Sequence, residues 1–168
     1  GLVAWVFWLL ALLSYSAQDA AWSTSGAGQA RMVSNWVGRL GAWLADSSYF
    51  MLGFSVWWAV VAFVWAWLSA LARWMRGGEV PEGAPSPLLR RLLFWGGLVL
   101  LLGASTALEW SRLYRFEALL PGHAGGVLGY VLGPASMKWL GFTGSGLLGI
   151  VLLVLGVALV FRFSWGQV

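Results

Sequence analysis

Four apolar stretches of the chain alternate with segments that are polar, basic or rich in glycine. A helix rises about 1.5 Å per residue, so about 20 apolar residues cross the hydrocarbon core of a bilayer. The pattern predicts transmembrane helices at about residues 2–15, 49–72, 91–108 and 146–161. The second is the clearest because it holds no charged residue. The first is shorter than a full span and begins at Gly1 without an initiator methionine, so we expect the chain to be a piece of a longer protein.

The first long segment between spans, residues 16–48, is expected to lie outside the membrane core. It begins with polar and small residues, which are typical of a loop. In residues 33–45, apolar side chains recur at spacings of three and four, which predicts an amphipathic helix too short to span. We expect this helix to lie at the membrane surface, and Ser47 or Ser48 to cap the second span.

The second long segment, residues 109–145, mixes charged pieces with an apolar run at 124–132 that is also too short to span. Gly125, Gly129 and Gly133 lie four residues apart in it, a spacing of small residues that favours close helix packing. Helix and coil both remain open for this run, because each glycine weakens a helix by about 1 kcal/mol.

Small residues also recur within the last two predicted spans, on or near one face of each helix. They are Gly96, Gly103 and Ala107 in the third span, and Gly141, Ser145 and Gly149 leading into the fourth. Such stripes let a neighbouring backbone approach closely in a membrane. We interpret them as packing surfaces.

The composition supports a membrane protein and excludes a soluble globular domain. Hydrophobic residues make up 60% of the chain and charged residues 10%, whereas soluble domains are about one quarter charged. A length of 168 residues fits one domain of four spans with their loops. The predicted fold is therefore all-α: a single polytopic membrane domain, residues 1–168, with four transmembrane helices and periplasmic amphipathic and glycine-rich segments.

Arginines concentrate around the short loop at residues 73–90. The stretch from Arg73 to Arg91 holds four arginines, more than either neighbouring loop. Because cytoplasmic loops carry an excess of basic residues, this loop is predicted to be cytoplasmic. Four spans then place both termini in the cytoplasm and residues 16–48 and 109–145 outside it.

Candidate chemistry is sparse. Transporters and pumps place ionisable groups inside their spans, but the predicted spans carry such groups only at their ends. His123 is the single histidine, and the adjacent proline and glycine favour a loop position over a haem ligand. The sequence holds no phosphate-binding glycine loop and no evident catalytic pair, so we expect no catalytic, cofactor-binding or metal-binding residue. A small membrane transporter or a cofactor-handling subunit is the alternative.

An ordered set of residues runs from the end of the first predicted span into the second. It comprises the run Ala11 to Tyr15, then Asp19, Trp22, Asn35, Gly38, the run Gly41 to Asp46, Phe50 and Gly53. Together with the basic middle loop and the glycine-rich outer segment, this set resembles the N-terminal membrane domain of FtsK/SpoIIIE-type DNA translocases. One departure is Ala20, where members of that family usually carry a proline that sets the turn.

The resemblance implies a membrane anchor whose parent protein continues into a cytoplasmic hexameric motor that uses ATP and Mg to pump DNA. The chain itself would contact DNA only through that motor, and the spans offer no basic lining for a DNA pore. The implied location is the bacterial inner membrane at the division septum. The implied partners are the lipid bilayer, divisome membrane proteins and further copies of the chain.

The candidate structural or interaction residues lie in the two outer segments. They are Asp19, Trp22, Asn35, Gly38, Gly41, Asp46, Gly125, Gly129 and Gly133. Our hypothesis is that Asp19, Asn35 and Asp46 hold the outer loop in shape rather than bind a ligand. For the small-residue stripes, packing within one bundle and contact with partners or other copies both remain open.

Overall fold

The computed structural model describes residues 1–21, 33–75, 77 and 86–161, and within them every regular element is helical. The elements are α1 (Leu2–Leu13), α2 (Gly38–Leu52), η1 (Gly53–Ser55), α3 (Val56–Met75), α4 (Pro87–Arg112), η2 (Tyr114–Leu119) and α5 (Gly126–Phe161). The all-α prediction is confirmed. The stretches Gly38–Met75, Pro87–Arg112 and Gly126–Phe161 are long and apolar enough to cross a membrane, and Leu2–Leu13 is a shorter apolar helix.

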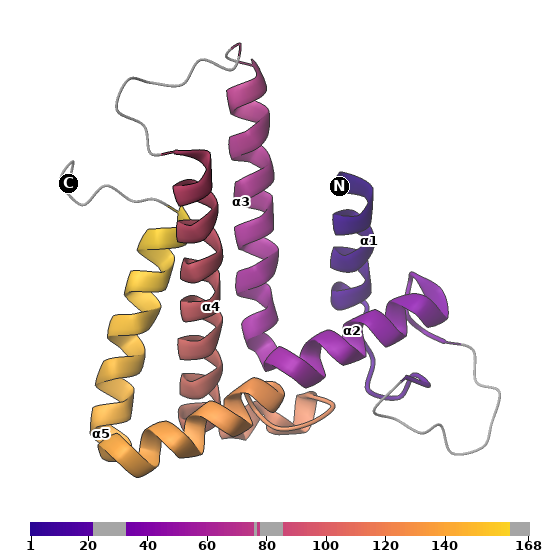
Figure 1. Ribbon diagram of the computed structural model, residues 1–168. Helices are drawn as coiled ribbons and strands as arrows, with labels where there is room; N and C mark the ends of the chain where they lie inside the picture. The colour runs from indigo at the N-terminus through magenta and orange to yellow at the C-terminus, as the bar shows by residue number, and fades with distance from the viewer. Residues whose placement is uncertain (22–32, 76, 78–85, 162–168) are drawn as a thin grey trace.

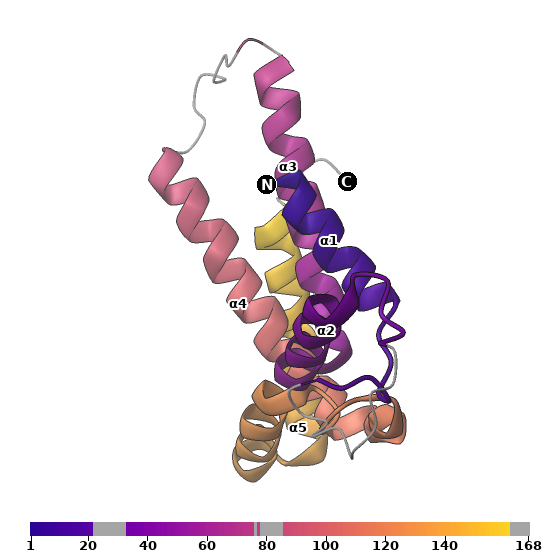
Figure 2. The same ribbon diagram turned by 90° about the vertical axis from the view of Figure 1, so that its right-hand side faces the viewer.

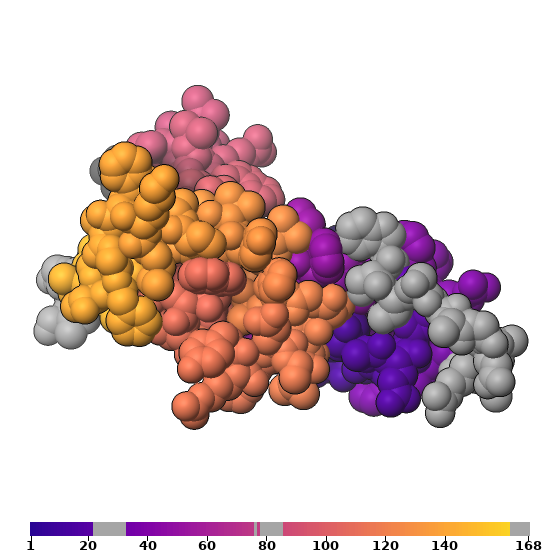
Figure 3. Space-filling view, turned by 90° about the horizontal axis from the view of Figure 1, so that it is seen from below, coloured from indigo at the N-terminus to yellow at the C-terminus, as the bar shows by residue number. Residues whose placement is uncertain are grey.

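Upright helical segments stand beside one another, and other segments lie across one end of them (Figure 1). The upright segments are α1, α3, α4 and the second part of α5, whereas α2 and the first part of α5 run across. We call α2 and residues 126–140 the transverse layer. Viewed from that end, η2 and the first part of α5 cover one half of the face, and N-terminal residues cover the other (Figure 3). The starts of α1 and α4 and the ends of α3 and α5 lie on the opposite side of this layer.

A glycine kink divides α5 into its two parts. Gly141 has φ 65° and ψ −178° within an otherwise helical stretch, a conformation open to glycine but strained for other residues. The glycine-rich run at 124–132, left open as helix or coil, is helical from Gly126 onward. The kink lets one continuous element serve both as a transverse segment and as the last upright helix (Figure 1).

The junction between α2 and α3 lies later in the chain than predicted. Ser47 and Ser48 are inside α2, where their hydroxyls donate to the carbonyl of Leu44 at 3.1 and 2.6 Å. The predicted cap at these serines is therefore wrong, because the hydroxyls are satisfied by the preceding turn of the same helix. The chain instead turns at Gly53, with φ 59° and ψ −148°, and the upright helix begins at Val56.

Glu109 of α4 holds this junction. Its Oε1 accepts a hydrogen bond from the backbone N–H of Phe54 at 2.9 Å. Its Oε2 accepts from the N–H and the hydroxyl of Ser55 at 3.0 and 2.8 Å. The first N–H groups of a helix lack partners within the helix and attract negative charge, so the carboxylate of α4 caps η1, the 3-10 turn that leads directly into α3. Glu109 is only 3% exposed, which makes the cap a buried contact rather than a surface one.

The glycine series at the start of α5, with Gly125 directly before it, packs against α4. A Cβ atom added to Gly125 or Gly129 would lie 2.2 or 2.5 Å from the carbonyl oxygen of Thr106, and one added to Gly133 would lie 2.4 Å from the Trp110 ring. Only a residue without a side chain permits this approach of the two backbones. In the described structure, these three glycines are packing positions inside the bundle.

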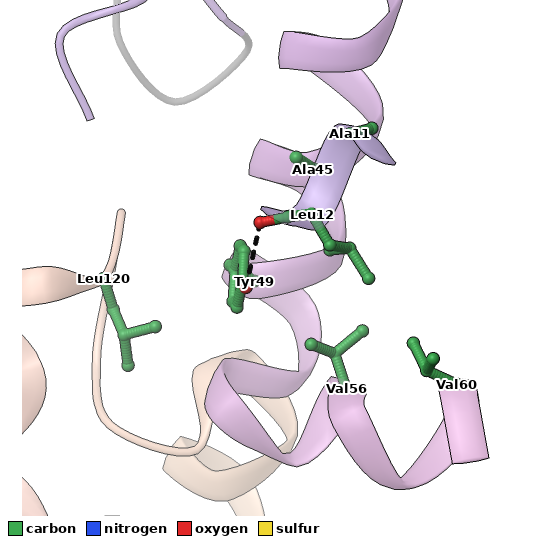
Figure 4. Packing of buried hydrophobic residues seen from close by; sticks show 7 residues of the cluster. All are labelled: Ala11, Leu12, Ala45, Tyr49, Val56, Val60 and Leu120. Atoms are coloured by element: carbon green, nitrogen blue, oxygen red, sulfur yellow. Dashed lines mark hydrogen bonds between the residues drawn. The ribbon is translucent and has the colours of Figure 1, made fainter. Parts of the chain in front are cut away.

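Buried side chains form small clusters rather than one large core. The largest joins α1, α2 and α3 with Leu120, and within it the hydroxyl of Tyr49 donates to the carbonyl of Leu12 at 3.3 Å (Figure 4). Many large apolar side chains point outward instead, for example Val99 at 71% exposure and Leu147 at 68%. Apolar surface of this extent on upright helices fits a lipid environment.

We predict that Glu109→Gln lowers the free energy of unfolding by roughly 3 kcal/mol, because the neutral side chain weakens the charge-assisted bonds and turns an amide toward backbone donors. The measurement is the thermal unfolding midpoint of the purified chain in mild detergent. Glu117→Gln is the matched control, since the Glu117 side chain is 41% exposed and pairs with His123; a change of under about 0.5 kcal/mol is expected there. Equal effects of the two variants would refute the buried cap.

Gly125→Ala is expected to destabilise the chain by roughly 2 kcal/mol or more, because both a positive φ and a carbonyl contact oppose a side chain. Gly125 has φ 73° and faces the oxygen of Thr106, whereas nothing lies within 4 Å of a Cβ added to Gly96. Gly96→Ala should therefore be neutral, or stabilising by up to about 1 kcal/mol through better helix propensity. The same unfolding assay compares the two, and a harmless Gly125→Ala would contradict the packing described.

Candidate functional site

Asp19 lies at the centre of a polar network that connects the end of α1 to the chain leading into α2. Its carboxylate accepts from the N–H and the hydroxyl of Ser34, both at 2.9 Å, and from the N–H of Asn35 at 3.0 Å. Asp19 is 6% exposed. A carboxylate that accepts three hydrogen bonds holds its donors firmly, so it fixes where the chain returns toward α2.

Asn35 ties this returning chain to the end of α1. Its side-chain amide donates to the carbonyls of Ala11 and Ser14 at 2.9 and 3.3 Å. Its side-chain oxygen accepts from the N–H of Val37 at 3.1 Å. These bonds satisfy carbonyls left open at the C-terminal end of α1, and they leave the 4%-exposed side chain with its polar atoms engaged.

Two glycines make room for this turn. Gly38 has φ 70° and donates its N–H to the carbonyl of Asn35 at 2.9 Å. A Cβ added to Gly41 would lie 2.3 Å from the side-chain oxygen of Asn35. The resemblance motif around Asn35, Gly38 and Gly41 is therefore one local unit, in which the glycines accommodate the asparagine.

Asp46 lies further along α2 and is 1% exposed. It is close enough to Tyr15 to interact with it electrostatically, and the Tyr15 and Tyr49 rings lie 4.9 Å apart between centroids. Asp46 thus faces the end of α1, as Asp19 and Asn35 do. Trp22, the remaining residue predicted in this segment, lies outside the described residues.

The predicted site residues fall into two groups in space. Asp19, Asn35, Gly38, Gly41 and Asp46 gather where α1 meets α2. The other group, Gly125, Gly129 and Gly133, lies between α4 and α5.

Sequence reasoning missed the roles of Ser34 and Glu109. The Ser34 contact spans 15 positions and the Glu109 contact with Ser55 spans 54. No periodicity links residues so far apart in the chain. A carboxylate at the end of an apolar run was the one signal for Glu109, and it is equally typical of an ordinary helix end.

An apolar groove of about 540 Å³ lies between α4 and α5. Gly96, Gly103 and Ala107 of α4 line it, with Leu132 and Trp139 on the side of α5. The predicted packing stripe of the third span is thus not covered at Gly96 by the described part of the chain. Gly97 is the glycine in close contact, since a Cβ added there would lie 2.7 Å from the Cβ of Leu159.

His123 lies at the edge of the transverse layer. Its Nδ1 lies 2.8 Å from a carboxylate oxygen of Glu117, and its ring stacks on Tyr130 with 4.8 Å between centroids. Among the residues that the structure describes, no cluster of three or more His, Cys, Asp or Glu side chains has the arrangement of a metal site. His123 instead joins η2 to the start of α5.

Comparison with known proteins identifies the family of this chain. The model for the 4TM region of DNA translocase FtsK/SpoIIIE matches residues 1–168. The DNA translocase FtsK 2 of Ralstonia nicotianae is 38% identical over 161 residues, covering 95% of this chain and 20% of the relative. The DNA translocase FtsK of Pseudomonas syringae pv. syringae is 35% identical over 165 residues, covering 97% and 19% respectively. No solved structure matches the chain.

The chain spans about one fifth of the length of these curated relatives. The match falls on the membrane region of the relatives, and the ATPase motor lies outside it. The helical architecture, the apolar spans and the whole-length match point to the same conclusion. The chain belongs to the FtsK/SpoIIIE family of DNA translocases, as their four-transmembrane region.

Proposed function

We propose that the chain anchors an FtsK-type DNA translocase in the inner membrane at the division septum, through contacts with divisome membrane proteins and with other copies of itself. In this proposal the parent protein carries the motor that uses ATP and Mg to move DNA, and DNA reaches this chain only through that motor. The observation that carries the proposal is the use of the buried carboxylates. Asp19 and Glu109 both cap backbone N–H groups, so they build a scaffold rather than a reaction site.

The same observation argues against the transporter alternative. A transport pathway needs ionisable groups that face a cavity and can exchange protons or ions. Glu109 is the buried carboxylate of α4, and both of its oxygens accept hydrogen bonds from η1. Releasing them would uncap η1 at the start of α3, so the carboxylate is poorly suited to carry a proton or an ion.

We place the transverse layer on the periplasmic side, with both chain ends and the loop 73–90 in the cytoplasm. The arginine excess of that loop supports this orientation. The geometry is compatible, because α1 begins and α5 ends on the same side of the layer (Figure 1). The transverse layer is then the surface offered to the periplasmic parts of divisome proteins, and the network of Asp19, Asn35 and Asp46 sets its shape.

The test of the anchor function is the position of a fluorescent fusion of this chain in dividing bacteria. A band at the septum is expected, because the targeting contacts belong to the membrane domain in this proposal. A second fusion, of an unrelated four-helix membrane protein of similar size, controls for the doubled membrane at the septum. Uniform labelling of the envelope by both fusions would contradict the proposal.

Substitution of Asn35 distinguishes a structural role in the outer network from direct contact with a partner protein. Asn35→Ala removes the hydrogen bonds to Ala11, Ser14 and Val37, so we expect a loss of roughly 2–3 kcal/mol in stability and a parallel loss of septal recruitment. Unfolding in detergent and the septal fraction of the fusion are measured together. Gln18→Ala, at an exposed amide, should change neither. An Asn35→Ala chain of normal stability that fails to reach the septum would mean that Asn35 binds a partner directly.

For self-assembly we propose a second copy of the chain in the groove between α4 and α5, since Gly96 presents an uncovered small-residue face in a membrane helix. Gly96→Leu fills open space, so folding should persist while association weakens about tenfold or more, a loss of about 1.4 kcal/mol. Mass measurement in mild detergent over a dilution series reads this out. Ala70→Leu, an exposed small residue of α3, is the control. Unchanged association of Gly96→Leu would exclude this groove as the contact.

A further inference from the structure

A basic cleft lies between α3 and α4 on the side away from the transverse layer. Figure 2 shows the two helices separating toward the end of α3 and the start of α4. The cleft between them measures about 270 Å³. Three arginines line it, Arg73 from α3 and Arg90 and Arg91 from α4. Guanidinium groups from two separate helices thus converge on one hollow.

No acidic side chain lines this cleft among the residues that the structure describes. Across residues 1–21, 33–75, 77 and 86–161, no ion pair involves Arg73 or Arg91. The first turn of α4 holds no acidic residue either. Cations near a helix N-terminus oppose the helix dipole, so Arg90 and Arg91 stand where a bound anion would be stabilising.

The inner wall of the cleft is aromatic. Trp65, Phe94 and Trp95 line it next to the arginines, and the rings of Phe94 and Trp95 meet edge to face at 5.5 Å between centroids. Tryptophan is enriched where the hydrocarbon of a bilayer meets its headgroups, and arginine side chains reach from there toward the polar layer. The cleft therefore offers positive charge at one end and apolar surface beyond it.

We propose that this cleft binds an anionic phospholipid, with its phosphodiester held by Arg73, Arg90 and Arg91 and the upper part of an acyl chain lying on Trp65 and Phe94. The planar guanidinium group matches the non-bridging oxygens of a phosphate through paired N–H donors. Basic pockets between membrane helices are a known setting for acidic lipid headgroups. A free phosphate would use the arginines but leave the aromatic wall bare, which is why a lipid fits the whole cleft better.

The test compares phosphatidylglycerol with phosphatidylcholine of the same acyl chains, each titrated onto the detergent-purified chain and followed by native mass spectrometry and thermal unfolding. Retention of phosphatidylglycerol about tenfold stronger is expected, a difference of about 1.4 kcal/mol. This comparison needs no variant. Equal retention of the two lipids would overturn the proposal. It would leave the septal anchor function untouched, because that function is read from the fusion in cells.

Variants then locate the site. Arg73→Gln with Arg91→Gln should reduce the preference to about twofold or less, while Arg90 stays in place because it makes another interaction of its own. Arg39→Gln with Arg115→Gln removes the same charge from exposed positions on α2 and η2 and should leave the preference intact. An equal loss in both double variants would show attraction to net charge alone and overturn the site.

Two further ligands test whether the cleft binds a lipid, a free anion or an acidic protein segment. Inorganic phosphate, and separately polyglutamate, are added to the wild-type chain at the concentrations that suffice for phosphatidylglycerol. Neither is expected to stabilise the chain comparably, because neither covers the aromatic wall. Stabilisation by phosphate as large as by the lipid would assign the cleft to a free anion. Stabilisation by polyglutamate would assign it to an acidic protein segment, and either result would overturn the lipid assignment.

Discussion

The architecture depends on one carboxylate, that of Glu109, which supplies the acceptors for the backbone donors where α2 turns into α3. A turn buried among membrane helices leaves N–H groups without water, and each unsatisfied group is costly. The close approach of Glu109 to this turn requires glycine at position 53. A Cβ added to Gly53 would lie 2.4 Å from Oε1 of Glu109 and 2.7 Å from the backbone N of Gly125. The turn, the cap and the α4–α5 contact are therefore coupled at one point.

The same principle acts at the other end of α2. There Asp19 accepts the N–H groups of Ser34 and Asn35 as the chain approaches the helix. Both junctions of α2 are thus held by side chains from distant parts of the sequence rather than by residues of the helix itself. One face of α2 buries Ala45 and Tyr49 against α1 and α3, while Leu40 on another remains 76% exposed. The polar anchors at the two ends of the helix act together with this packing to fix its direction.

Hydropathy was sufficient for the helical class and the approximate positions of the upright helices, because burial in lipid acts on whole stretches of sequence. It failed at the α2–α3 junction. Serine is a residue type favoured at helix caps, whereas Gly53, the actual turn, lies within an apolar run and gives no signal of a helix end. Whether Gly125 and Gly129 formed helix or coil could not be decided locally, since the answer depends on the Thr106 carbonyl of another helix. For the outer network, Asp19, Asn35 and Asp46 were identifiable from the family motif, but Ser34 and the hydrogen-bond partners were not.

Charge is distributed differently at the two ends of the bundle. On the side of the transverse layer, Asp19 and Glu109 are used within the fold and fix its helices. On the other side, Arg73 and Arg91 face a cleft where α3 and α4 separate (Figure 2). A phosphodiester bound between them would bridge α3 and α4 where the two helices separate (Figure 2). Lipid composition would then act on the spacing of α3 and α4, while the opposite face kept its shape.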